Sequence, residues 1–371
     1  MPSAVPCKIA IAVITLVAFG GPASAADRLI LRNLDIILDR TVIQIDEDGI
    51  ELDAARPRGT SHLTWDEIER GTVALDQPNF DRLLAEFGPP LYRVRQRLKT
   101  GDYEALAEPA EQLYPRFASR KSQSAYMVCQ AVMWSRMVAG QREAAVEPYL
   151  RCFEILRSGR AKLAQLPGTR RLAVEPKTAI STDLLPVWFD PVASKAALPA
   201  VHEAIREMAQ PRPEGVYIYY ATLALAAGEP AEADRVLRLF RGDEPLAAQW
   251  HDIVLAQQEV LAGAPGANVE RLRTTVNDFS PASRPAALYW LGMAHLRSPD
   301  ATTVRDGVLE LLTLPAAHAT TDPHLAAAAL FHAAEALEKL KDPKASAALR
   351  QELTVQFGNT SFGAKSQTRE R

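Results

Sequence analysis

The chain has 371 residues, enough for two or three domains or for one extended repeat array. It holds 42 basic and 45 acidic residues, a formal net charge of −3, and its Lys and Arg residues are scattered, which excludes the electrostatic footprint of a nucleic-acid-binding protein. Aromatic residues make up only 7% of the chain and alanine is abundant, a composition that favours closely packed helices over a β-sandwich.

The first 25 residues have the pattern of a secretory signal peptide. Lys8 precedes an apolar run from Ile9 to Phe19, and Ala23-Ser24-Ala25 supplies small residues for cleavage before Ala26. The run is too short to cross a bilayer as a helix, which needs about 20 residues. We therefore expect an exported protein, periplasmic or secreted, with no membrane span after signal removal; the alternative is a retained N-terminal anchor.

Residues 26–75 predict a small all-β module. The segments LILRNLDIIL, TVIQI and GIEL are rich in Ile, Leu and Val, Asp46–Gly49 is a good hairpin connection, and Ser61–Trp65 is a further short strand. This order resembles the small SH3-like or Sm-like barrels of exported proteins, which implies a spacer or docking unit. Asp46, Asp48 and Glu51 lack the spacing of a calcium-binding EF-hand loop, so no metal is assigned.

From residue 76 onward the apolar residues recur every three to four positions, which predicts helices. The first helix contains Phe80 and Phe87 and is expected to end at Pro89-Pro90. Later helices are divided by turns that are separated by 39, 88, 35 and about 78 residues, and because the last interval holds a further hairpin, most repeat units are about 35–42 residues long. These turns are expected at Gly101, Gly140, Gly228, Gly263 and Lys341–Asp342.

The clearest hairpin runs from Val216 to Phe240. Large, small and bulky residues recur in it and in other hairpins at fixed spacings, as in Tyr217, Tyr220-Ala221 and Ala224; Leu288, Leu291-Gly292 and His295; Leu330, Ala333-Ala334 and Leu337; and Ala145, Tyr149 and Cys152. This pattern resembles the tetratricopeptide family. The resemblance implies a mainly α fold, an α-solenoid of antiparallel helix hairpins over 76–159 and, more regularly, over 214–371.

Residues 160–213 do not fit the repeat and are interpreted as an irregular insert with one helix, from Ser194 to Ala209. Exposing Leu184, Trp188 and Phe189 to water would be unfavourable, so we expect the insert to lie against the helical array.

Two cysteines, Cys129 and Cys152, remain after signal removal. They stand at equal distances on either side of the turn at Gly140–Gln141, which places them level on neighbouring helices. An oxidising compartment would allow a disulfide between them. Two buried free thiols are the alternative.

A search for catalytic chemistry finds no nucleophile elbow, phosphate-binding loop, dinucleotide fingerprint or zinc-protease motif. His332 and Glu335 could share one helix face, with His324 near the start of that helix. The more economical interpretation is an ordinary helix surface, so no catalytic residue, metal or cofactor is assigned.

In tetratricopeptide-like arrays the first helix of each hairpin lines a concave groove that receives peptides or protein segments. Carried over to this chain, the resemblance implies a groove formed by Gln130, Trp134, Ile218, Thr222, Tyr289, Met293, Phe331 and Glu335. The alternative is that the same side chains pack against the 160–213 insert.

Three functions follow from these interpretations. The first is an exported, non-enzymatic interaction scaffold that binds a protein or peptide partner in the groove, and an open groove would favour it. The second is a structural or assembly component of the cell envelope, which a groove filled by the insert would favour. The third is a metal-dependent hydrolase with a site near His324–Glu335, which would require three ligands to converge on one ion.

Overall fold

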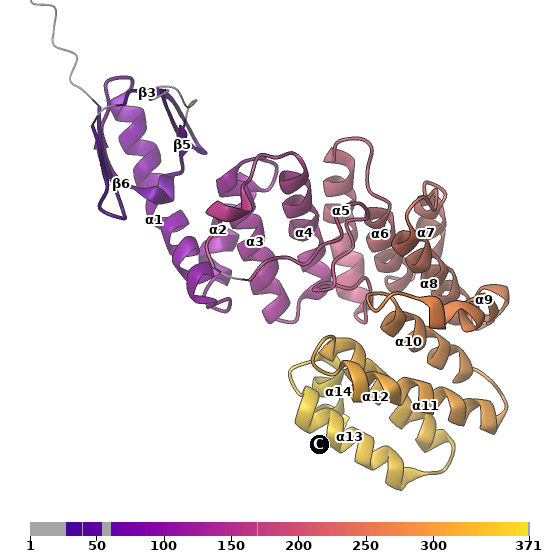
Figure 1. The fold of residues 1–371 in the computed structure, drawn as a ribbon. Helices are drawn as coiled ribbons and strands as arrows, with labels where there is room; N and C mark the ends of the chain where they lie inside the picture. Colours follow the sequence, from indigo (N-terminus) through magenta and orange to yellow (C-terminus); the bar gives the residue numbers. More distant parts are fainter. Residues whose placement is uncertain (1–26, 39, 54–60, 169, 370–371) are drawn as a thin grey trace, which may run out of the picture. The chain divides into compact units, whose positions relative to one another are not determined.

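The computed structural model describes residues 27–38, 40–53, 61–168 and 170–369, so the predicted signal peptide lies outside the described residues. The chain divides into two compact units, Met1–Gly88 and Pro89–Arg371. It is mainly helical, with a small N-terminal β region of two sheets (Figure 1). The predicted fold class is confirmed at this level.

Two antiparallel three-stranded sheets build the β region. One has the order β2-β1-β6 and the other β3-β4-β5. The buried core between these strands includes Leu29, Ile50 and Trp65, and the Trp65 ring meets Phe80 edge-on. The strands are β1 (Arg28–Leu31), β2 (Ile36–Ile37), β3 (Val42–Asp46), β4 (Gly49–Leu52), β5 (Ser61–Leu63) and β6 (Ile68–Thr72).

The hairpin at Asp46–Gly49 is confirmed, since these two residues pair across β3 and β4. Gly49 has φ 150°, and a Cβ there would lie 2.0 Å from the carbonyl oxygen of Leu63, so only glycine fits. Two details differ from the prediction. The segment from Leu29 to Leu38 turns back on itself to give β1 and β2, and β6 was not predicted because its residues IERGT have little β character.

The expected helix end at Pro89-Pro90 is wrong. Helix α1 runs without interruption from Gln77 to Thr100, and both prolines lie inside it. A proline inside a helix costs about 3 kcal/mol. Phe80 and Phe87 are buried before the prolines and Leu91 and Val94 after them, and this burial on both sides offsets the lost hydrogen bonds.

In the part of the chain that the structure describes, the helical unit continues from the second half of α1 through thirteen further helices. They are α2 (Ala107–Phe117), α3 (Gln123–Val138), α4 (Arg142–Arg157), α5 (Pro191–Glu207), α6 (Gly215–Ala226), α7 (Pro230–Leu237), α8 (Pro245–Leu261), α9 (Ala267–Thr275), α10 (Arg284–His295), α11 (Ala301–His318), α12 (Pro323–Lys339), α13 (Pro343–Phe357) and α14 (Ser361–Arg369). Helix α5 is the predicted helix of the insert, shifted by two or three residues. Helix α14 was not predicted.

All five predicted turns are present. Gly101, Gly140, Gly228 and Gly263 have φ between 73° and 77°, and Lys341 has φ 62°. Each lies one or two residues after the end of a helix, where a left-handed residue ends the hydrogen-bond pattern. The hairpin from Val216 to Phe240 is therefore α6 and α7, as predicted.

Most neighbouring helices in sequence pack on each other, and a second set of contacts joins alternate helices: α4 with α6, α6 with α8, α8 with α10, α10 with α12 and α12 with α14. Helices α10 and α11 approach each other closely. A Cβ on Gly292 would lie 2.7 Å from Cγ of Leu311, and one on Gly307 would lie 2.9 Å from the Gly292 carbonyl oxygen. Glycine at these positions lets the two backbones meet.

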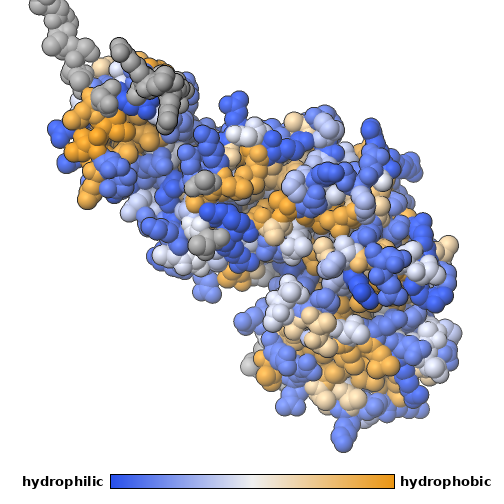
Figure 2. Space-filling view, in the orientation of Figure 1, coloured by the Kyte–Doolittle hydropathy of each residue, from blue (hydrophilic) through white to orange (hydrophobic). Residues whose placement is uncertain are grey.

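The β region exposes several large aliphatic side chains to solvent: Leu34 (78% exposed), Ile36, Leu38 and Ile43. Apolar surface is visible on this unit in Figure 2. Among the residues that the structure describes, no helix is both long and apolar enough to cross a membrane.

Candidate functional site

The residues of the predicted groove lie on α3, α6, α10 and α12, as the hairpin pattern requires. Most of them are not exposed. Five are buried, namely Gln130, Trp134, Ile218, Thr222 and Tyr289, and three are half-buried, namely Met293, Phe331 and Glu335. The groove is therefore not an open surface at these positions.

The 160–213 insert covers three of the four helices. The guanidinium of Arg170 lies 3.7 Å from the ring centroid of Trp134 on α3. Nε1 of Trp188 donates a 2.8 Å hydrogen bond to Oγ1 of Thr222 on α6. The expectation that the insert lies against the array is thus confirmed.

Farther along, the insert meets the C-terminal helices. The ring of Phe189 packs edge-on against Tyr289 of α10, with centroids 5.7 Å apart, and against Phe362 of α14, at 5.2 Å. The ring centroid of Phe362 in turn lies 5.0 Å from that of Phe331 on α12. The insert and α14 together fill the groove, which the sequence had left open as an alternative.

A recess of about 550 Å³ remains beside the filled groove, within the helical unit. Its size falls in the range of about 300–1,000 Å³ that is usual for ligand pockets. It is lined by the start of α4 with the turn before it, the part of the insert from Val187 to Asp190, one face of α5, Glu111 of α2, Arg136 of α3, and the first residues of α12 and α14. The α5 face is apolar and shallow, formed by Ala193, Ala196, Ala197 and Ala200.

Ion pairs within the protein neutralise most of the charges around the recess. Arg136 donates from Nε and Nη2 to both carboxylate oxygens of Glu111, at 2.7 and 2.9 Å. Glu147 accepts a 2.5 Å hydrogen bond from Nε of Arg151 and another from the Tyr114 hydroxyl. Such groups line the recess without offering an unpaired charge to a ligand, because each charge is already matched by its partner.

Two adjacent residues in the first turn of α4 are different. Arg142 is 9% exposed; its Nη2 donates to the Leu185 carbonyl oxygen at 3.2 Å, its Nη1 lies 3.7 Å from the Asp322 carboxylate, and its Nε is buried without an acceptor. Glu143 is 7% exposed, and burial raises the pKa of its carboxyl, although the neighbouring Arg142 charge and backbone hydrogen bonds at Asp190 and Phe189 oppose the shift. Sequence reasoning missed both residues. The signal that could have found them is a charged pair at the first turn of a helix whose later residues are almost all buried.

His324, at the start of α12, is half-buried in the wall of the recess. Burial lowers the pKa of its imidazole to about 4, and the nearby Arg142 guanidinium lowers it further while Asp322 opposes the shift. The ring is therefore neutral at pH 7 and can donate or accept one hydrogen bond.

The histidines considered for a metal site do not meet. His324 faces Arg142, whereas His332 lies 3.5 Å from Glu335 and packs against the rings of Tyr289 and Phe362. Within the described part of the chain, no three His, Cys, Asp or Glu side chains are grouped so that they could hold a metal ion.

Cys129 and Cys152 lie level on α3 and α4, as their distances from the turn predicted. Both are fully buried free thiols. The Cys152 thiol contacts that of Cys129, and burial raises its pKa well above the usual value. The structure therefore presents the free-thiol alternative.

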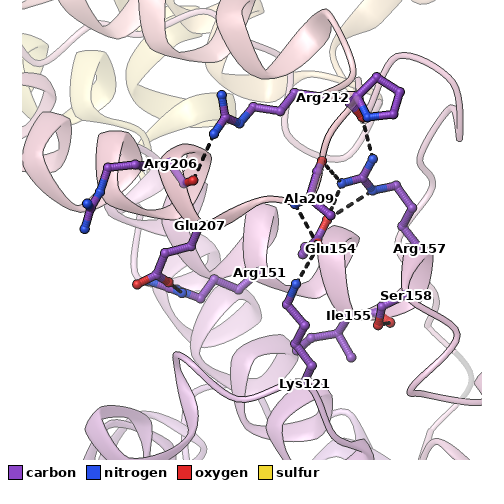
Figure 3. Close-up of polar contacts among 11 residues, drawn as sticks. Lys121, Arg151, Glu154, Ile155, Arg157, Ser158, Arg206, Glu207, Ala209 and Arg212 are labelled. Carbon is purple, nitrogen blue, oxygen red and sulfur yellow. Dashed lines mark hydrogen bonds and ion pairs between the residues drawn. The ribbon is translucent and has the colours of Figure 1, made fainter.

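A second polar cluster fastens the end of the insert to α4 (Figure 3). The Glu154 carboxylate accepts hydrogen bonds from Lys121 Nζ at 2.7 Å, from Arg157 Nη2 at 2.6 Å and from the backbone N–H of Ala209 at 3.2 Å. Arg157 also donates to the carbonyl oxygens of Ala209 and Pro211. Because every group in this set has a partner, the cluster is best explained as a clamp for the insert.

No protein-family model, characterised protein or solved structure matches this chain.

Proposed function

We propose that this chain is an exported, non-enzymatic interaction protein with a tetratricopeptide-like array of helical hairpins, and that it binds a short peptide segment of a partner in the recess beside α4 and α5. Contacts between alternate helices support the array, since stacked hairpins bring their first helices together. Export rests on the sequence of residues 1–25.

The observation that carries the binding function is the make-up of the recess. Most ionised side chains around it are matched by internal pairs, while the alanine face of α5 and the side chains of Val187 and Phe189 provide apolar contact area. A few convergent polar groups on an apolar wall are typical of sites that bind a small segment. Because the insert and α14 fill the groove, we place the binding surface in this recess and not on the faces of the first helices.

The second candidate, a structural or assembly component of the cell envelope, is favoured by a specific observation. The insert covers the groove at Trp134, Thr222 and Tyr289, so a partner would have to use outer surfaces. The exposed aliphatic residues Leu34, Ile36 and Leu38 of the β region are one such surface.

The two candidates are separated by selecting from a random peptide library on the mature chain, beginning at Ala26. Ala196→Trp fills the recess from an exposed position of α5 and should abolish capture of the selected peptides. Val192→Trp adds the same bulk at a position 80% exposed outside the recess lining and should leave capture unchanged. Equal capture by both variants, or no selected peptide, would reject the recess as the binding site. Mass spectrometry of the purified protein tests export, with Ala26 as the expected first residue.

A further inference from the structure

The carboxylates around the recess outnumber the cations. The charged lining residues are Glu111, Glu143, Glu147 and Asp190 against Arg136 and Arg142, and His324 is neutral. Internal pairs account for Glu111 with Arg136 and for Glu147 with Arg151. An anionic ligand would add to this excess of negative charge, whereas a cationic ligand would neutralise it.

Glu143 is the lining carboxylate that these ion pairs do not account for. Asp190 is exposed and caps α5 by accepting hydrogen bonds from the N–H groups of Val192 and Ala193, so the helix N-terminus balances its charge. Glu143 is 93% buried by contrast, and in the described chain it forms no ion pair with a Lys, Arg or His side chain. The Arg142 charge and the backbone hydrogen bonds at Asp190 and Phe189 stabilise this carboxylate only in part, because burial still raises its pKa. A cation placed beside it would offset the remaining cost of burying the charge.

Arg142 points to a second feature of the ligand. Its Nε–H is buried and has no acceptor, and a buried donor without an acceptor costs about 1–3 kcal/mol. A carbonyl oxygen, delivered directly or through a water molecule, would satisfy this donor without bringing a negative charge next to Glu143. Peptide backbone supplies such oxygens.

The apolar side of the recess fits an aliphatic stem. Ala193, Ala196, Ala197 and Ala200 present only methyl groups along α5. Long basic side chains bury their methylene stems against such surface while the charged head reaches a polar partner. The volume of about 550 Å³ exceeds that of one side chain and leaves room for the backbone on either side of it.

We infer that the recess binds a peptide segment through a lysine or arginine side chain, with the cationic head against Glu143, the stem along the alanine face of α5, and a backbone carbonyl oxygen toward Arg142. This inference rests on the proposed peptide-binding function and specifies its ligand.

The probes are three acetylated, amidated pentapeptides, Ala-Ala-X-Ala-Ala, with lysine, norleucine or glutamate at X. Norleucine keeps the stem of lysine and lacks its charge. Binding to the mature chain is measured by calorimetry or by peptide NMR. The lysine peptide should bind at least tenfold more tightly than the norleucine peptide, and the glutamate peptide should bind most weakly.

Glu143→Gln should abolish the preference for lysine over norleucine. Glu203→Gln, which removes a carboxylate from α5 outside the recess, should preserve it. The comparison of peptides on the unaltered protein stands even if Glu143→Gln folds poorly. Norleucine or glutamate binding as tightly as lysine, with binding still lost in Ala196→Trp, would overturn the inference and leave the proposed function intact. Failure of every pentapeptide together with an empty library selection would overturn both.

Discussion

Phe189 and Tyr289 are separated by one hundred residues in sequence, yet their rings pack edge-on with centroids 5.7 Å apart. The contact joins the insert to α10 and closes the groove that the hairpin pattern implied. Phe362 of α14 also packs edge-on against Phe189. The insert is therefore a structural part of the helical unit, held by aromatic contacts in its middle and by the Glu154 cluster near its C-terminal end (Figure 3).

Phe189→Ala should release the middle part of the insert. The substitution removes two edge-on aromatic contacts, and since Phe189 is only half-buried we expect a loss of about 1–3 kcal/mol of unfolding free energy. Urea denaturation measures the loss, and hydrogen exchange should show faster exchange around Leu184–Trp188. Val192→Ala, at a position 80% exposed in the same segment, is the control and should change stability by less than about 0.5 kcal/mol. Unchanged exchange in Phe189→Ala would show that the aromatic contacts do not hold the insert.

The close crossing of α10 and α11 predicts that substitutions at Gly292 and Leu311 have non-additive effects on stability. Gly292→Ala should destabilise the protein by about 1–3 kcal/mol, because the new methyl group would lie 2.7 Å from Cγ of Leu311. Truncating that neighbour in the double variant Gly292→Ala, Leu311→Ala makes room for the methyl group. The two substitutions together should therefore cost less than the sum of their separate effects. Thr302→Ala, at an exposed position of α11, is the control, and strictly additive losses would contradict the close crossing.

Local features of the helical unit could be predicted from the sequence because each depends on a few neighbouring residues. Gly101, Gly140, Gly228 and Gly263 mark helix ends since a left-handed residue ends a helix wherever it occurs. Features that depend on distant residues were missed. The sequence contains a Pro-Pro pair in α1 but not the burial on both sides that keeps the helix continuous.

The recess also depends on residues that are distant from one another in the sequence. Its walls come from α2, α3, α4, the insert with α5, α12 and α14, which no local pattern brings together. Arg142 and Glu143 look like ordinary surface charges in sequence, because an isolated charged pair after a turn is usually solvated. Their burial follows from the path of the insert, which only the folded chain reveals.

The two cysteines allow a direct test of the alternative that the sequence left open. In the native mature protein, Cys129 and Cys152 should resist alkylation by iodoacetamide, because both are fully buried and burial raises the pKa of the Cys152 thiol, which lowers its thiolate fraction. After unfolding without a reductant, mass spectrometry should find two added groups. Cys129→Ser should then take up one. If alkylation of the unfolded, unreduced protein fails and two groups are added only after reduction, the pair is a disulfide and the free-thiol state is wrong.

His324 predicts a loss of stability in mild acid. Its folded-state pKa is about 4, below the usual 6.5, so between these values the unfolded state binds more protons than the folded state. The contribution of the neutral ring to the free energy of unfolding is complete above about pH 6.5 and is lost as the pH falls toward 4. The full shift would correspond to about 3 kcal/mol, and since the ring is partly exposed we expect about 1–2 kcal/mol. Urea midpoints measured between pH 7 and pH 4 should fall less steeply in His324→Asn. His202→Asn, which replaces an exposed histidine of α5, should follow the unaltered protein, and identical slopes in all three proteins would contradict the assignment of this acid sensitivity to His324.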